Sequence, residues 1–212
     1  MKLKKIASLM LAGVMAVSML AGCSNTAVDP EPTPDPDPAP ATGYSAMLDE
    51  KVDDKNDYVT FADNANDEAA LEYALNSVGQ MMADKLAYVK DVTKVDSGSK
   101  VAAEFTDKAE LNTYCDWRTL NNNWTDGETV KDGILYVVDG TVAMENVLDD
   151  IAVNVLKVVE KLPNTSYGTR AKYSFDYVVS VSVVNKPVTI VEGYTASANF
   201  IAVTITRTAT QL

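Results

Sequence analysis

Apolar residues recur at helical spacing in three parts of the chain. After a polar start at Asn66 they stand every three to four positions, which predicts a helix to about Lys90. A second helix is expected over residues 106–120, where the apolar stripe is weaker. The third stripe, over residues 144–162, alternates spacings of four and three until Pro163 ends it. Its wide apolar face predicts the central packing helix.

Toward the C-terminus the period of the apolar residues changes to two. Residues 173–183 place aromatic residues and valines on one face and mainly serine and aspartate on the other. Shorter runs follow at 188–191 and 201–206. These runs predict an antiparallel meander with one face open to solvent, and residues 58–61 predict an additional edge strand.

Asp132 and Gly133 stand between two apolar runs in the middle of the chain. This pair is the residue choice of a type I′ turn, so it predicts a β-hairpin there. The whole order of elements predicts an α+β fold, with about three helices packed on a mainly antiparallel sheet that ends in a C-terminal β-meander. Residues 44–212 suffice for one core and contain no second Pro/Gly-rich linker, so we expect them to form a single domain.

The first 23 residues have the pattern of an export signal. Three lysines stand among the first five residues, and an apolar run over residues 6–20 is short for a membrane span. The closing tetrapeptide Leu20-Ala21-Gly22-Cys23 resembles the lipobox of bacterial lipoproteins. In that family the chain is cut before the cysteine, which is then acylated. The resemblance implies that residues 1–22 are removed, that Cys23 is the lipid attachment site, and that the protein is held at the bacterial cell membrane outside the cytoplasm.

Residues 23–43 connect this expected anchor to the domain. Six of the chain's eight prolines stand at every second position from Pro30 to Pro40, mostly alternating with acidic residues. Proline fixes φ and disfavours helical geometry in the residue before it, so the segment is expected to be extended polyproline II. At about 3.1 Å per residue it would act as a semi-rigid spacer roughly 60 Å long.

Charge and composition exclude several classes of function. The chain has 18 basic and 30 acidic residues, and loss of the leader's three lysines would leave 15 basic residues and a formal net charge of −15. Such a charge repels polyanions, so nucleic acid is not an expected partner. Histidine is absent, which excludes Ser-His and Cys-His catalysis and imidazole metal sites. No metal ligand set, cofactor motif or complete catalytic motif is predicted.

The second cysteine, Cys115, would have no intramolecular disulfide partner once Cys23 is acylated. Its position four residues after Leu111 on the expected helix favours a small buried apolar residue. A reactive or intermolecular thiol is the alternative. No oligomeric state is predicted.

Aromatic side chains close to amides are the best indication of a binding site. Flat rings stack on the apolar faces of sugars, and amides hydrogen-bond to hydroxyls. The candidate ligand-binding residues are Tyr114, Trp117, Asn122, Asn123 and Trp124. Packing of both tryptophans in the core is the alternative.

These patterns favour a non-enzymatic surface module that binds an envelope glycan or a protein partner. One alternative is a small cell-envelope hydrolase that uses two carboxylates, because glycoside hydrolysis requires only two acids at a suitable separation. With 30 acidic residues the sequence selects no pair. A third alternative is an accessory lipoprotein of a transporter or signalling system.

The lipid anchor is testable by replacing its attachment residue. We expect Cys23→Ala to move the protein from the membrane fraction to the soluble fraction, because the alanine cannot be acylated. Cell fractionation and immunoblotting measure this. Cys115→Ala is the matched control, since it removes the chain's other cysteine. Continued membrane retention of Cys23→Ala would contradict the anchor.

Overall fold

The computed structural model describes residues 43–52, 55–80, 83–84, 91–121, 127–166, 172–192 and 194–212. The expected leader, Cys23 and the proline-rich linker up to residue 42 lie outside the described residues.

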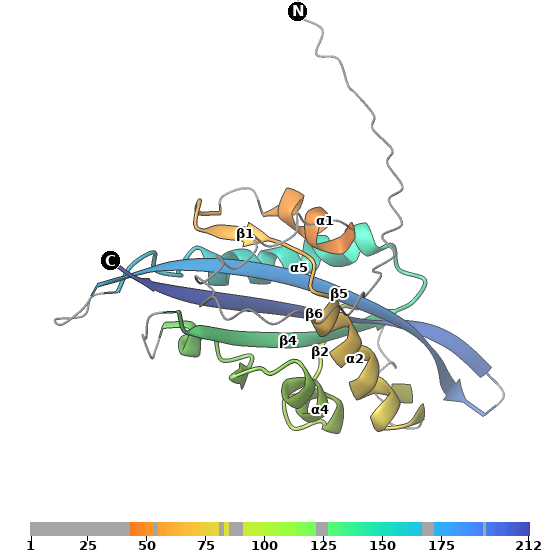
Figure 1. Ribbon diagram of the computed structural model, residues 1–212. Helices are drawn as coiled ribbons and strands as arrows, with labels where there is room; N and C mark the ends of the chain where they lie inside the picture. Colours follow the sequence, from red (N-terminus) through yellow and green to blue (C-terminus); the bar gives the residue numbers. More distant parts are fainter. Residues whose placement is uncertain are drawn as a thin grey trace, which may run out of the picture. The chain divides into compact units, whose positions relative to one another are not determined.

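One mixed sheet forms the centre of the described domain (Figure 1). Its strands are β1 (Val59–Phe61), β2 (Thr93–Lys94), β3 (Thr113–Tyr114), β4 (Thr129–Asp139), β5 (Tyr173–Val191) and β6 (Tyr194–Gln211). The strand order is β1-β5-β6-β4-β2, with β3 also paired to β4. The three long strands β5, β6 and β4 pair antiparallel, whereas β1 and β3 join parallel to their neighbours. The predicted α+β class is confirmed.

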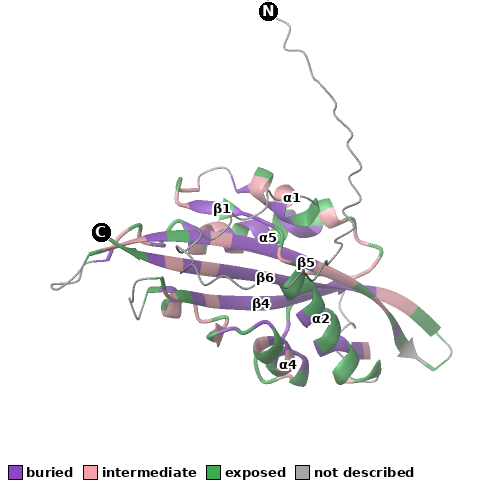
Figure 2. Ribbon diagram, in the orientation of Figure 1, coloured by how far each residue is buried: buried purple, intermediate pink, exposed green. Residues whose placement is uncertain are grey.

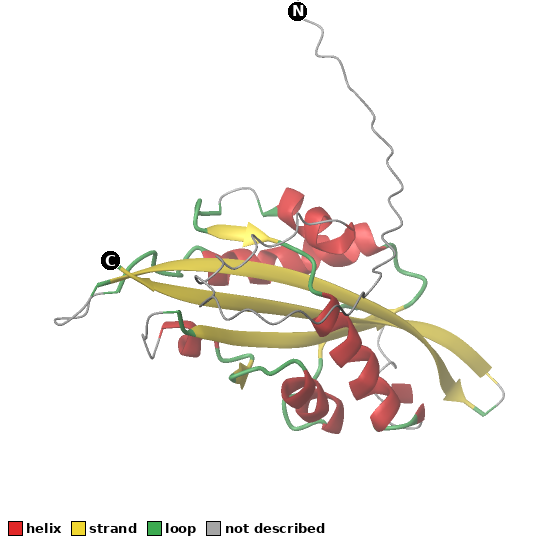
Figure 3. Cartoon of the chain, viewed as in Figure 1, coloured by secondary structure: helices red, strands yellow, loops and turns green. Residues whose placement is uncertain are grey.

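Helices lie on both sides of this sheet (Figure 3). The described helices are α1 (Gly43–Lys51), α2 (Ala65–Ser77), α4 (Lys100–Lys108), α5 (Met144–Val159) and the short 3₁₀ helix η1 (Trp117–Asn121). Helices α1 and α5 pack with one face of the sheet in one apolar cluster, and α2 and α4 pack with the other face in a second cluster. The domain therefore has three layers.

Helix α5 is the central packing helix that the third stripe predicts. Its buried residues follow the three-to-four spacing, and Ile151 and Val159 have no exposed surface. They pack against Ile134 and Ile205 of the sheet. The expected helix over residues 144–162 is confirmed from Met144 to Val159.

The prediction of one solvent-facing side of the C-terminal sheet is wrong. Ser180, Ser182 and Thr204, which look like surface residues in the sequence, are at most 5% exposed. Helices α2 and α4 cover this face and share an apolar cluster with Leu135 and Phe200 of the sheet. Leu71 of α2 and Phe105 of α4 are fully buried there. Figure 2 shows the resulting burial along β4, β5 and β6.

Two helix predictions need correction. Helix α2 ends at Ser77 because Gly79 has φ +77°, a left-handed conformation that commonly ends helices, so it does not run continuously to Lys90. Of the helix expected over residues 106–120, only residues 106–108 are α-helical, as the end of α4, because the left-handed residues Glu110 and Cys115 interrupt the rest. Cys115 is also exposed rather than buried.

The predicted hairpin at Asp132 and Gly133 is wrong as well. Both residues lie inside β4, which pairs with β6 without interruption from Thr129 to Asp139. A Cβ at Gly133 would stand 3.0 Å from Leu111 Cδ1 and 3.1 Å from Thr204 Cγ2. The glycine therefore permits close packing on both sides of the strand rather than a turn.

The edges of the sheet are short or covered. The outer strands β1 and β2 have three and two residues. Where β5 extends past β1, Gln80 Nε2 donates to the carbonyl of Pro187 at 2.6 Å, and the Thr189 N–H donates to Asp84 Oδ1 at 2.6 Å. Side chains that follow α2 thus hydrogen-bond to backbone groups of β5 with which another strand would pair.

A buried ion pair connects α2 to the sheet. The Asp67 side chain is 1% exposed, and one of its oxygens pairs with Lys131 Nζ. The other accepts the Thr204 hydroxyl proton at 2.7 Å, and Lys131 Nζ also donates to the Ala109 carbonyl at 3.0 Å. Four parts of the fold meet at this pair, namely α2, β4, β6 and the end of α4.

We expect Asp67→Asn to lower the free energy of unfolding by about 3 kcal/mol, because it leaves the Lys131 ammonium without its charge partner. Urea unfolding measures this. Asp149→Asn is the control, since it removes a largely exposed partner of Lys51, and it should cost less than about 1 kcal/mol. Equal effects of the two substitutions would contradict the role given to the buried pair.

Candidate functional site

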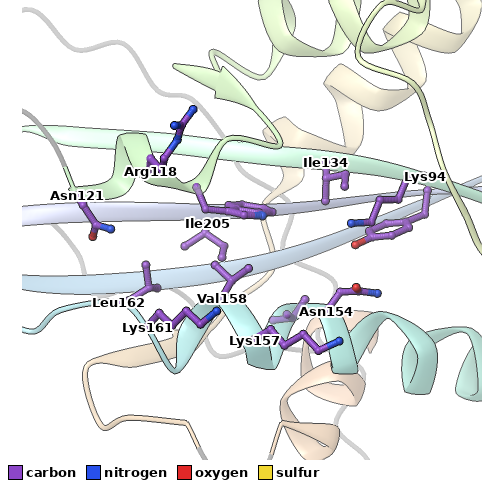
Figure 4. Close-up of a pocket in the computed structure, with 13 residues that line it drawn as sticks. Lys94, Arg118, Asn121, Ile134, Asn154, Lys157, Val158, Lys161, Leu162 and Ile205 are labelled. Atoms are coloured by element: carbon purple, nitrogen blue, oxygen red, sulfur yellow. The ribbon is translucent and has the colours of Figure 1, made fainter.

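A cavity of about 370 Å³ lies between α5 and η1, above strands β4 and β6 (Figure 4). Its lining residues come from all four elements and from the segments beside them. They are Lys94, Trp117, Arg118, Asn121, Ile134, Tyr136, Asn154, Val155, Lys157, Val158, Lys161, Leu162 and Ile205. The volume lies within the range of small-molecule sites in proteins.

The floor of the cavity is apolar and made of buried core residues. Ile134 and Ile205 are at most 2% exposed and belong to neighbouring strands, and Val155 and Leu162 come from the α5 side. All four are members of the larger apolar cluster. Because these residues are part of the core, the cavity is already formed in the ligand-free domain.

The 3₁₀ helix η1 positions Trp117 at the wall of the cavity. Leu120 of the same helix is fully buried, and its carbonyl accepts a hydrogen bond from Arg207 Nη1 at 2.8 Å. Thr119 is bonded to the Thr113 hydroxyl at 2.9 Å. With η1 held at these points, Trp117 packs partly against the core and lines the cavity with the rest of its surface.

Tyr136 is a buried polar group at this site. Its side chain is 3% exposed and lines the cavity, and burial raises the pKa of its hydroxyl to about 12. Within the described part of the chain, its hydroxyl makes no hydrogen bond. Since Tyr136 lines the cavity, its hydroxyl is suited to bonding with a molecule there.

Positive charge gathers around the cavity. Four of the 13 lining residues are basic and none is acidic. Arg118 is neutralised by Asp116, to which its Nε and Nη2 donate at 2.8 and 3.0 Å, and Figure 4 shows its side chain directed away from Lys157 and Lys161. Among the described residues, Lys94, Lys157 and Lys161 have no ion-pair partner within 4.0 Å.

The structure brings one predicted ligand-binding residue to the cavity, which is Trp117. Tyr114 is in β3 instead, where its hydroxyl donates to the Val95 carbonyl at 2.8 Å and accepts from the Leu135 N–H at 3.1 Å. It joins strands and does not line the cavity. The other three candidates, Asn122, Asn123 and Trp124, lie outside the described residues.

Sequence reasoning missed most of the remaining lining residues. Tyr136 stands in an apolar run and has the pattern of an ordinary strand residue. Lys157 and Lys161 are four positions apart, which gave a weak signal of a shared helix face. Lys94 comes from a strand of two residues that no pattern predicts.

The lining of the cavity combines basic, aromatic and amide side chains. It contains no carboxylate, serine, threonine or cysteine. Among the described residues, no three Cys, Asp or Glu side chains are grouped so that they could hold a metal ion. In the same residues, no helix is long and apolar enough to cross a membrane.

Comparison with known proteins adds no relative. No protein-family model, no curated protein and no solved structure matches the chain.

Asp132 is a buried acidic residue of β4, opposite Thr113 of β3 in the sheet. Its carboxyl is fully buried, and one oxygen accepts a hydrogen bond from the Gly133 N–H at 2.7 Å, whereas the other has no hydrogen-bond partner among the described residues. Burial outweighs the hydrogen bond from Gly133 and raises the pKa of the Asp132 carboxyl to about 6. Between about pH 4 and pH 6 the folded chain therefore holds a proton that the unfolded chain releases.

Folding is consequently favoured at the acid end of this interval. As the pH rises from about 4 to above 6, we expect the stability of the wild type relative to Asp132→Asn to fall by about 2–3 kcal/mol. Urea unfolding of both proteins at several pH values measures this difference. A difference that is constant over the interval would contradict the raised pKa of Asp132.

Proposed function

We propose that this chain is a lipid-anchored, extracytoplasmic binding protein of the bacterial envelope, and that its ligand lies in the cavity between α5 and η1. The observation that carries the proposal is the combination in one cavity of an apolar floor, Trp117, and the unpartnered hydroxyl of Tyr136. Export and anchoring rest on the lipobox resemblance at Cys23. The expected spacer at residues 23–43 would hold the cavity away from the bilayer.

The lining of the cavity favours binding over catalysis. Glycoside hydrolysis needs two carboxyl groups on either side of the bond that is broken, and this cavity has none. A separate hollow of about 260 Å³ beside the start of α1 includes Asp63 and Glu68. Both of these residues are exposed to solvent, whereas a general acid of this class depends on apolar surroundings to remain protonated.

An envelope glycan fits the cavity better than a protein partner does. Protein interfaces use broad surfaces, usually about 800 Å² on each partner, whereas this site is a concave cavity with an aromatic ring and amides. Trp117 offers a ring face, and Asn121 and Asn154 offer amide donors and acceptors. These groups match the apolar faces and the hydroxyls of sugar rings.

We expect Trp117→Ala to weaken binding of envelope polysaccharide by about tenfold, because it removes the stacking surface. The measurement is retention of fractionated envelope polysaccharide on the immobilised mature protein. Tyr194→Ala is the matched control, since Tyr194 is an aromatic residue that is 59% exposed at the start of β6 and does not line the cavity.

Circular dichroism of each variant establishes that it is folded. Unchanged retention by folded Trp117→Ala would place the binding site elsewhere. Release of shortened saccharides by the wild type would favour the hydrolase instead.

A further inference from the structure

We propose that the ligand of this cavity is an acidic saccharide, whose carboxylate or phosphate lies among Lys94, Lys157 and Lys161 while a sugar ring lies on Trp117. This inference rests on the proposed binding function and adds the chemical class of the ligand. It follows from the distribution of charge in the domain, from the positions of the lysines and from the uncharged groups between them.

The charge of the cavity is opposite to that of the chain. Acidic residues outnumber basic residues by 30 to 18 in the sequence, yet the lining has four basic residues and no acidic one. Four lysines elsewhere in the described domain have an acidic partner, for example Lys51 with Asp149 and Lys131 with Asp67, and Lys100, Lys172 and Lys186 have none. The three lysines at the cavity lack such neighbours among the described residues, so their charge is available to a bound anion.

Interaction with the dipole of α5 explains only some of the lysines at the cavity. Lys157 is in the last turn of α5 and Lys161 follows the helix, where positive charge interacts favourably with the helix dipole. However, two lysines four positions apart repel each other. Lys94 comes from β2, on a separate element, and Figure 4 shows it across the hollow from Lys157 and Lys161. The dipole of α5 does not explain a cation at that position.

The uncharged lining groups indicate that the anion is attached to a ring with hydroxyls. A free inorganic anion would use the lysines but would leave the Trp117 ring and the Asn121 amide without a role. The hydroxyl of Tyr136 and the amide of Asn154 stand in the same lining as the lysines. A sugar acid or sugar phosphate presents a ring face, hydroxyls and one charge together, and so uses all of these groups.

The net charge of the chain further restricts the ligand. A densely charged polyanion would meet repulsion from the net negative charge of the chain, and this repulsion acts over about 10 Å at 0.1 M salt. A saccharide with separated charges places one anionic group in the cavity and little charge outside it. Nucleic acid therefore remains an unfavourable partner despite the local lysines.

Isothermal titration calorimetry of the mature protein with defined saccharides tests this inference. The probes are a neutral galactose oligomer, an oligogalacturonate of the same length, a hexose 6-phosphate, the unmodified hexose and inorganic phosphate. We expect at least one charged sugar to bind about tenfold or more tightly than its neutral counterpart, and more weakly as salt is added. The uronate and sugar-phosphate arms identify which anion is preferred.

The double variant Lys157→Glu/Lys161→Glu should lose this preference, with binding of the charged sugar weakened by about tenfold or more. The double variant Lys100→Glu/Lys172→Glu is the matched control, because it has the same net charge and changes lysines that do not line the cavity. It should bind as the wild type does. Circular dichroism and the unfolding midpoint establish that both variants are folded.

The outcomes separate this inference from the proposed function. Equal binding of neutral and charged sugars, abolished by Trp117→Ala, would overturn the anionic class and leave the binding function intact. Binding of inorganic phosphate as tightly as the sugar phosphate would overturn the role of the ring. If none of the charged sugars binds to the folded wild type, the inference is wrong, and retention of envelope polysaccharide then decides the proposed function separately.

Discussion

Burial of both faces of the central strands is the constraint on which the rest of this structure depends. Eight consecutive residues of β6, residues 198–205, are at most 7% exposed, so each face of the strand requires its own covering layer. Helices α1 and α5 supply one layer, and α2 and α4 supply the other. The Asp67–Lys131 ion pair lies between α2 and the sheet. The rest of the contact between them is largely apolar, so the pair fixes the position of α2 on the sheet.

The candidate site lies where one of these layers is incomplete. Beyond the last turn of α5, the sheet is covered by the short helix η1, and the cavity occupies the space between the two. Its floor is the core itself. Its wall is fixed by the Arg207 hydrogen bond to the Leu120 carbonyl and by the Thr113 hydroxyl at Thr119. A site built in this way needs little rearrangement on binding, which limits the entropy lost when a ligand is held.

Patterns within single elements predicted the fold class well, and contacts between distant elements account for the errors. The stripe of α5 and the alternation of β5 are local, and both were visible in the sequence. The Asp-Gly pair predicts a turn at Gly133, but the glycine is needed because Leu111 and Thr204 approach it closely. These residues are far from Gly133 in the chain, so no local pattern indicates the contact. Trp117 is recognisable in the sequence as a candidate binding residue. Tyr136 and the three lysines are not, because they line one cavity only when the fold brings β2, β4 and α5 together. The left-handed backbone at Cys115 has no reliable sequence signature for a residue other than glycine.

The short and partly covered edges of the sheet affect whether neighbouring copies of the domain associate at high density. Exposed strands recruit one another through unsatisfied amide and carbonyl groups, and tethering to a surface would raise the local concentration at which such recruitment begins. In the described domain the outermost strands are too short to template a partner, and the side chains of Gln80 and Asp84 occupy part of the margin of β5. Crowded copies of this domain should therefore stay separate and keep their cavities accessible, instead of fusing into continuous cross-molecular sheets.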